Sequence, residues 1–438
     1  MFKTLQNAFK IKDIRQKLVF TFLMMVLIRL GSQIPVPGAN RMYFAQWFAA
    51  QTGDAFNFFD AFTGGSFTSM SLFALGINPY ITSSIIMQLL TIAIPKLEEM
   101  HKDGEEGRKK IQTITRYVTV ALALIESVAM TIGFGGQGLL ENPTWYNMAV
   151  VVVTLTAGSA FLMWIGERIT QNGVGNGISI VLLINIISRV PDDFVKLYQV
   201  FMQNKSVAMA ALAAVIILAV VLVTIVLVII LQDGERRIPV QYSKKLQGRK
   251  VVGGQSTHIP MKVNTAGVIP VIFASSLMSF PGVIAALLGK SGGTGIGSKI
   301  MRGLSSSSWF DPENPVYTLG FILYMVLIVF FAYFYTSITF NPLEIADNMK
   351  KQGGFIPGIR PGRPTTEYLT KILNYIIFIG AIGLLIVCTI PLVFNGIFGA
   401  NVSFGGTSLI IIVGVVLETL KQIESQMAVR YYKGFLND

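Results

Sequence analysis

Few side chains in this chain of 438 residues are placed for covalent or acid–base chemistry. Its one cysteine, Cys388, lies in an apolar run, and its two histidines, His101 and His258, lie in polar segments without cysteine or acidic partners at ligand spacing. A nucleophile needs a nearby base, and a metal ion needs several ligands. The sequence therefore predicts that the protein is not an enzyme and holds no metal ion or cofactor. The one acid well within an apolar run is Glu126.

The most unusual polar residues interrupt residues 56–95, a stretch that is apolar enough for a membrane but contains glycines, serines, threonines and Pro79. About 20 uninterrupted apolar residues cross a bilayer. Here a short piece rich in Gly, Ser and Thr, residues 60–75, precedes a second apolar piece, residues 77–94. Broken backbone at membrane depth is tolerated only where protein or a water-filled cavity surrounds it. The pattern therefore indicates a cavity in the membrane and a segment that can move in it.

The composition is typical of a protein that crosses the membrane many times. Hydrophobic residues make up 52% and charged residues 13% of the chain, against about 25% charged residues in soluble domains. The run at 178–190 is short, which favours a helix surrounded by protein or a locally thin membrane. In all, the apolar runs predict ten spans, at residues 18–36, the broken pair within 56–95, 114–134, 146–165, 178–190, 207–231, 263–288, 316–340, 372–398 and 404–417.

The 35 lysines and arginines lie mainly on one side of the predicted membrane. This bias predicts that both termini are cytoplasmic. Residues 1–17 place apolar side chains at helical spacing beside basic ones, which suits a helix lying on a surface of anionic lipids. A disordered basic tail is the alternative for this segment.

Two long loops on the cytoplasmic side, residues 232–262 and 341–367, hold much of the positive charge. Basic loops are expected on this side of any membrane protein. The Pro and Gly spacing of residues 353–362 also predicts a stiff, turn-rich loop with Arg360 near its tip. Such a loop can bind anionic partners, and ribosomal RNA is one that this charge would attract.

Seven motifs, in order along the chain, resemble those of the SecY family, which forms the channel of the bacterial Sec translocase. The resemblance covers essentially the whole length. Turns rich in Gly and Pro are common between helices, so the ordered set carries the resemblance and no single motif does. The motifs are GINPYI (76–81), GEEGRKK (104–110), GVGNGIS (173–179), RRIPV (236–240), AGVIPVIFASS (266–276), GIRPG (358–362) and FGGTS (404–408).

The resemblance implies an all-α polytopic membrane protein with ten helices in two pseudo-symmetric five-helix halves around an hourglass pore, and a short plug helix. The halves would be residues 18–206 and 207–427, followed by a cytoplasmic tail, 428–438. The second spans of the two halves each begin with a Gly/Pro break followed by Ile and a Ser pair, Ser83-Ser84 and Ser275-Ser276. Interruptions at corresponding positions point to a central pathway. In the family these two helices form the lateral gate.

The family's activity is to conduct unfolded secretory polypeptides across the bacterial plasma membrane and to release hydrophobic segments laterally into it. The partners implied are SecE- and SecG-like small subunits, the SecA ATPase, the ribosome, signal sequences and unfolded polypeptide clients. Among the basic residues, Arg360 matches the family's central loop arginine. The SecA and ribosome contacts that we expect are Arg236, Arg237, Lys244, Arg249 and Arg360.

Residues 60–75 match the family's plug, which fills the external funnel of the resting channel. Because Gly, Ser and Thr limit its apolar contacts, we expect its displacement to cost little, with Gly64-Gly65 and Gly76 as hinges. A re-entrant helix that never moves is the alternative. The plug residues are Asp60, Phe62, Gly64, Gly65, Ser66, Phe67, Ser69, Met70, Leu72 and Leu75.

The resemblance also implies a ring of aliphatic side chains that narrows the pore, with Leu182 where we expect Ile. Apolar constrictions dewet and resist ions. The lateral gate needs weak polar contacts, each worth about 0.6 kcal/mol, and Glu126 either joins them or pairs with another polar group. The ring residues are Ile81, Ile85, Ile178, Leu182, Ile272 and Ile411. The gate candidates are Gln88, Asn264, Ser276 and Glu126.

A secondary transporter is the alternative function, because such carriers also use inverted repeats and broken helices. Carriers need intramembrane ionisable groups for ion coupling. This chain offers few of them: Glu126 centrally, with Arg29 and Glu418 toward helix ends.

Overall fold

Every predicted span coincides with a helix in the part of the chain that the computed structural model describes. By length and hydropathy, five of these helices, α7, α8, α10, α13 and α15, are long and apolar enough to cross a membrane. The helices of the first half are α2 (Lys12–Gly31), α5 (Asn78–Ala93), α7 (Gly104–Phe134), α8 (Trp145–Asn172) and α9 (Gly177–Phe201). Those of the second are α10 (Val207–Asp233), α11 (Ile269–Leu287), α13 (Thr318–Thr339), α15 (Arg363–Phe398) and α16 (Gly406–Gly434).

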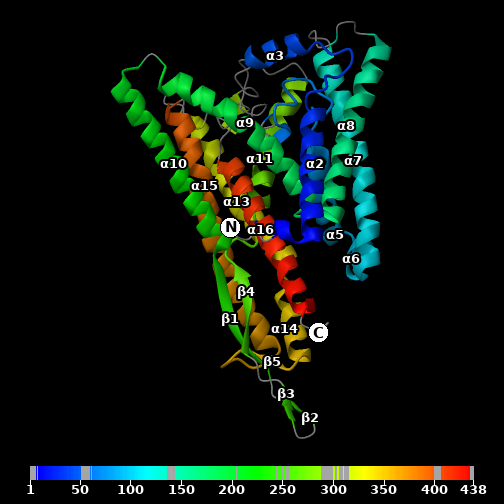
Figure 1. Cartoon of the computed structure of the whole chain (residues 1–438), viewed down its shortest axis with the longest axis vertical. Helices are drawn as coiled ribbons and strands as arrows, with labels where there is room; N and C mark the ends of the chain where they lie inside the picture. The colour runs from blue at the N-terminus through cyan, green and yellow to red at the C-terminus, as the bar shows by residue number, and fades with distance from the viewer. Residues whose placement is uncertain are drawn as a thin grey trace.

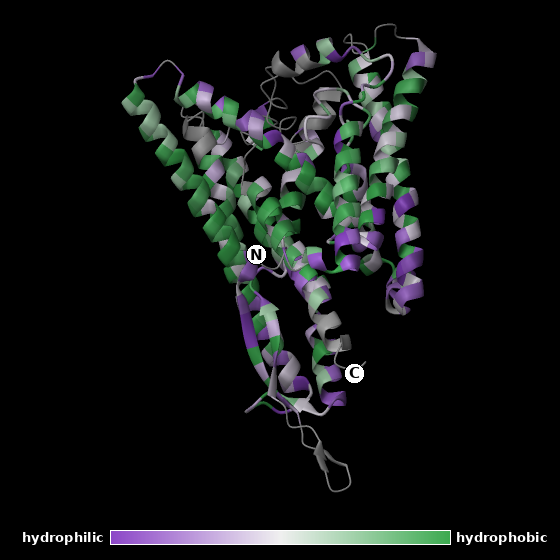
Figure 2. Ribbon diagram, in the orientation of Figure 1, coloured by the Kyte–Doolittle hydropathy of each residue, from purple (hydrophilic) through white to green (hydrophobic). Residues whose placement is uncertain are grey.

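The structure describes part of the chain. The described residues are 6, 8–50, 60, 62–135, 140, 144–203, 205–242, 245–247, 250–252, 256–287, 299–300, 303–304, 309, 315–398 and 406–434. The helices run side by side through most of the molecule, and a group of strands projects from one end (Figure 1). Hydrophobic residues cover most of α10, whereas hydrophilic residues gather on β1 (Figure 2). The helical fold class expected from the sequence is therefore confirmed.

The second span of the first half is bent. Helix α5 is followed by α6 (Pro95–Lys102), and the two axes differ by 106°. The cause is local, because proline lacks an N–H group and the residue before it avoids helical backbone. Ile94, which precedes Pro95, is extended, with φ −111° and ψ 111°. As a result, α6 packs against α7.

Helix α9 is longer than the apolar run that predicted it. The run ends at residue 190, but the helix continues through Pro191 to Phe201. Polar side chains recur along the helix at helical spacing, including Asn185, Arg189 and Asp193. Because they lower the mean hydropathy, hydropathy alone places the end of the helix too early. Asn185 and Asp193 are buried, which means that protein rather than lipid surrounds this face. The expectation of a helix surrounded by protein agrees with this burial.

The two basic loops contain strands and join in one sheet, which an all-α prediction did not include. β1 (Glu235–Tyr242) pairs antiparallel with β4 (Ser256–Lys262) and with β5 (Gly354–Phe355), in the order β4-β1-β5. Ile238 and Val240 alternate toward the core. There they pack with residues of α14 (Pro342–Lys351) and α15. A separate hairpin pairs β2 (Lys245–Gln247) with β3 (Lys250–Val252).

The N-terminal residues pack against protein. Ala8 and Ile14 are buried in one cluster with Val174 and with Ile423 of α16. This arrangement differs from the membrane-surface helix that we expected, because α16 extends well beyond its apolar run and offers an apolar face. Two short helices complete the described elements, α3 (Arg41–Ala50) and the 3-10 turn η3 (Pro315–Tyr317).

Candidate functional site

The segment that matches the plug lies between α3 and α5, and after the helical residues Asp60, Phe62 and Thr63 it is built of turns. Residues 64–77 form consecutive turns with one isolated bridge, Ser71 to Pro35. Helical backbone is therefore limited, within the described residues, to the start of the segment, and the expected helix does not extend through residues 64–75. Positive φ angles at Gly64, Gly65, Met70 and Gly76 explain the difference, because an α-helix needs φ near −63°.

The apolar side chains of this segment are deeply buried. Phe67, Met70 and Leu75 belong to one cluster, in which the Phe44 ring of α3 contacts the rings of Phe67 and Phe134 edge-on, with centroids 5.4 and 5.3 Å apart. Phe62 and Phe73 belong to a second cluster. The expectation that Gly, Ser and Thr limit its apolar contacts is wrong, because the turns direct the large side chains into two cores at once.

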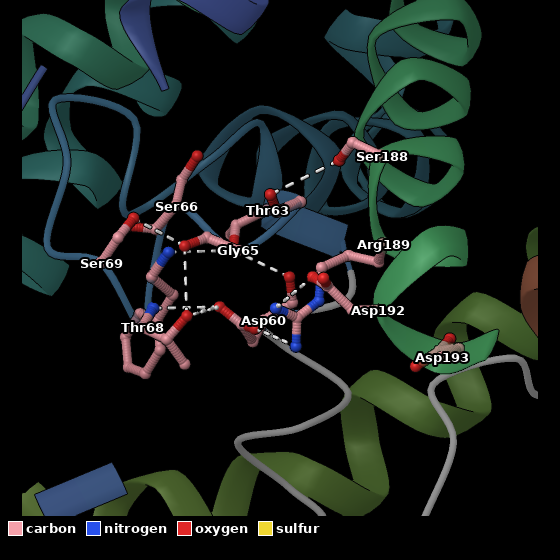
Figure 3. A network of polar contacts seen from close by, with 12 residues as sticks. Asp60, Thr63, Gly65, Ser66, Thr68, Ser69, Ser188, Arg189, Asp192 and Asp193 are labelled. Atoms are coloured by element: carbon pink, nitrogen blue, oxygen red, sulfur yellow. Dashed lines mark hydrogen bonds and ion pairs between the residues drawn. The ribbon is translucent and has the colours of Figure 1, made fainter. Parts of the chain in front are cut away.

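Polar contacts also hold the segment to α9 and α2. Asp60, which is 0% exposed, forms an ion pair with Arg189 of α9, with Nη2 and Oδ2 2.8 Å apart. Thr68 donates its N–H and hydroxyl to the other carboxylate oxygen, at 2.9 and 3.0 Å. Figure 3 shows this network. The backbone is bound too: Asn185 donates to the Phe62 carbonyl at 3.0 Å, and Arg29 donates to the Gly64 carbonyl at 3.3 Å.

Close backbone packing fixes the segment against its neighbours. A Cβ atom on Gly158 of α8 would lie 1.9 Å from the Leu72 carbonyl oxygen. Because glycine has no Cβ, the backbone of α8 can approach Leu72 this closely. Leu72 in turn donates its N–H to the Ile34 carbonyl at 2.8 Å. The segment is therefore held by side chains and backbone of α2, α3, α8 and α9.

Five of the six expected ring residues lie in one aliphatic cluster that also contains Phe62 and Phe73. They come from α5, α9, α11 and α16, so both halves of the chain contribute. Ile85 is half-buried and lies outside this cluster. The plug segment thus packs directly on the cluster. The five are Ile81, Ile178, Leu182, Ile272 and Ile411.

The expected gate residues are in different environments. Asn264 is buried, and its Nδ2 has no hydrogen-bond partner among the described residues. Among the same residues, the buried Oε2 of Glu126 also has no partner. Gln88 and Ser276 are exposed, while the neighbouring Ser275 hydroxyl lies 3.2 Å from that of Tyr324.

Helix α7 lies at the junction of the two halves, because it packs against both α5 and α11. The hydroxyls of Ser83 and Thr119 form a buried hydrogen bond between α5 and α7. On α7, one turn before Thr119, Arg116 pairs with the largely buried Glu167 of α8 at 2.7 Å. The sequence prediction missed the Ser83–Thr119 contact, because on α7 it considered the acid Glu126 and not the hydroxyl side chains.

Three of the five expected cytoplasmic contact residues are described, and all three are exposed. Arg236 and Arg237 lie on β1, where Arg237 pairs with Glu235 at 2.6 Å. Arg360 follows the buried Ile356, and its carbonyl accepts a 2.8 Å hydrogen bond from Thr365. Lys244 and Arg249 lie outside the described residues.

Arg189 and Asn185 were missed as functional candidates. Asn185 lies three residues after the ring residue Leu182 on α9, and Arg189 lies four residues after Asn185. The sequence carried this helical spacing, but averaging the hydropathy over a window concealed it. Within the described residues, no cluster of three His, Cys, Asp or Glu side chains is arranged to hold a metal ion.

These features define a polytopic α-helical membrane protein whose two halves meet at an aliphatic cluster covered by a buried, turn-rich segment. The family model described as SecY matches residues 71–420. The protein translocase subunit SecY of Halalkalibacterium halodurans is 44% identical over 447 residues and that of Bacillus subtilis 41% over 454, each covering 100% of both chains. The chain belongs to the SecY family.

Solved structures share the fold at lower identity. One described as "The structure of a protein conducting channel" has a TM-score of 0.63 and 20% identity, and the match covers 94% of this chain and 92% of that one. Sec61 in the canine ribosome-channel complex has a TM-score of 0.59 and 19% identity with the same coverage. The fold is therefore that of the SecY and Sec61 channels.

Proposed function

We propose that this chain is the channel subunit of a Sec-type translocase, which conducts unfolded polypeptides across the bacterial plasma membrane and releases hydrophobic segments into it. The observation that carries the proposal is the packing of the turn-rich segment on an aliphatic cluster drawn from both halves of a SecY-family chain. Membership of that family disfavours the secondary transporter.

In the resting state, residues 60–75 act as the plug and the aliphatic cluster acts as the pore ring. A passing polypeptide displaces the plug, and the flexible aliphatic side chains fit around it while limiting water and ions. Support comes from Phe62 and Phe73, which belong to the same hydrophobic cluster as ring residues on four helices. Ile85 joins the ring when its helix moves during opening.

The lateral gate opens between α7 and α11, with α5 moving together with α7. Unsatisfied buried groups at Asn264 and Glu126 support this proposal, since a seam that leaves polar groups unpaired is weakly held. A hydrophobic signal sequence that enters the seam gains contact with lipid. We also assign Gln88 and Ser276, which are exposed, to this gate.

Both termini lie in the cytoplasm, where SecA or the ribosome binds the exposed arginines of the two basic loops. Arg236, Arg237 and Arg360 contribute positive charge to the described part of this surface, and we assign Lys244 and Arg249 to the same contact from their place in the sequence alone. SecE- and SecG-like subunits complete the channel. Support comes from the positive charge of these loops, which attracts phosphate-rich partners.

The decisive experiment joins the plug reversibly to the wall of the pathway. Cysteines replace Phe62 and Asn185, whose backbone and side chain are in contact, in a Cys388→Ala background. A short reducible cross-linker should then stop translocation of a secretory polypeptide into vesicles, and a reductant should restore it. Each single-cysteine variant, treated in the same way, is the control. Undiminished translocation by the linked protein would refute the plug assignment.

A further inference from the structure

Arg189 lies between two carboxylates that belong to different parts of the channel. Its Nη2 is 2.8 Å from Asp60 on the plug segment, and its Nη1 is 3.8 Å from Asp192, one turn further along α9. Figure 3 shows the guanidinium between the two acids. The environments of the acids differ, because the Asp60 side chain is 0% exposed and that of Asp192 is 64% exposed.

The contact with Asp60 cannot survive a movement of the plug. A buried charge that loses its partner is strongly destabilised, so the closed state depends on this pair. Arg189 itself is fixed to α9, and its side chain is 18% exposed. When the plug departs, the guanidinium is left in the external funnel with Asp192 as its nearest acid.

The other charged groups nearby already have partners. Asp193 pairs with Lys196 at 3.9 Å. Arg29 of α2 donates to the Gly64 carbonyl. Among the described residues, Asp60 and Asp192 are therefore the acids within 4 Å of the Arg189 guanidinium.

We propose that Arg189 is a gating residue that exchanges partners. It pairs with Asp60 while the plug is seated and with Asp192 once the plug has moved. Asp60 then stabilises the closed state, whereas Asp192 stabilises the open state and lowers the free energy needed to reach it. This inference rests on the proposed function of residues 60–75 as a movable plug.

The exchange predicts opposite effects for two similar substitutions beside one arginine. Asp60→Asn removes the charge that holds Arg189 in the closed state, so the resting ion leak should rise about tenfold or more, a change of about 1.4 kcal/mol in the gating equilibrium. Asp192→Asn should lower that leak and slow the translocation of polypeptides with weak signal sequences about two- to fivefold, as expected for an exposed pair.

The measurements use the channel purified from membranes together with its partner subunits. Resting ion conductance in planar bilayers reports the closed state, and translocation into vesicles reports opening. Asp192→Glu keeps the charge and is the matched control, which should behave as the original protein. In an Arg189→Gln background, Asp192→Asn should have no further effect, because the shared partner is absent.

Effects of Asp60→Asn and Asp192→Asn in the same direction would overturn the exchange, as would an unchanged conductance in both. A leak that rises with Asp60→Asn alone would also overturn it, since a simple anchor gives that result. Asp192 is exposed, so its variant tests the proposal even where Asp60→Asn reduces the amount of folded channel. Failure here leaves the cross-linking result unchanged, whereas failure of the plug assignment appears in that experiment.

Discussion

Gly158 of α8 offers the sharpest test of how tightly the plug is seated. A Cβ atom at this position would lie 1.9 Å from the Leu72 carbonyl oxygen. Ordinary carbon–oxygen contacts begin near 3.3 Å, so Gly158→Ala forces the Leu72 backbone to retreat by about 1.4 Å. That movement strains the hydrogen bond from Leu72 to the Ile34 carbonyl.

The free energy involved follows from the packing. Inserting a methyl group into a filled interior costs about 1–3 kcal/mol, and here the cost applies to the seated plug alone. The ratio of open to closed channels should therefore rise about 5- to 150-fold. Alanine also has a higher helix propensity than glycine by about 1 kcal/mol, so α8 itself becomes no less stable.

The assay is the resting ion conductance of the purified channel in bilayers, compared with Gly166→Ala. Gly166 lies on the same helix and is also buried, but its nearest neighbour, a side-chain atom of Ile178, would be 3.5 Å from the new Cβ. Both substitutions raise helix propensity equally, so only the contact with Leu72 separates them. Equal conductance of the two variants would refute the view that α8 holds the plug by close packing.

Two further predictions concern the ring and the cytoplasmic loops. Serine at Ile272 and Ile411 should raise ion leak, because a polar ring no longer dewets. Serine at the exposed Ile216 of α10 should not raise it. Unchanged conductance in the ring variant contradicts the role of the ring. Arg360→Glu should reduce SecA-driven export severalfold while leaving membrane insertion of the subunit intact. Pulse-labelled export measures the first effect, and the amount of subunit in membranes measures the second. Equal loss of both would show that Arg360 acts in folding.

The helical layout could be predicted because long apolar runs leave the backbone few alternatives in a membrane. The ring residues were placed by the resemblance, and Ile178 and Leu182 share one face of α9 because of their spacing of four. The local path of the plug could not be predicted. It depends on positive φ angles at Gly64 and Met70, and a sequence pattern shows the glycine but not the direction of the turn.

The partner of Asp60 could not be predicted either, because Arg189 lies more than a hundred residues away and beyond the centre of an apolar run. Hydropathy averages such a residue with its neighbours, so one buried ion pair changes the average little. The sheet was missed for a related reason. β5 has two residues, Gly354 and Phe355, and only its pairing with β1 gives it a strand conformation.

That sheet makes the two basic loops one mechanical body. A load applied near Arg360 passes through β5 to β1, and β1 continues from α10 with only Gly234 between them. The last residue of α10, Asp233, is bonded to Lys421 of α16. A push on these loops is therefore shared by α10, α15 and α16, and the last of these carries Ile411. In the proposed function, the stiffness of a few strands thus connects the partner that binds these loops to the proposed pore ring.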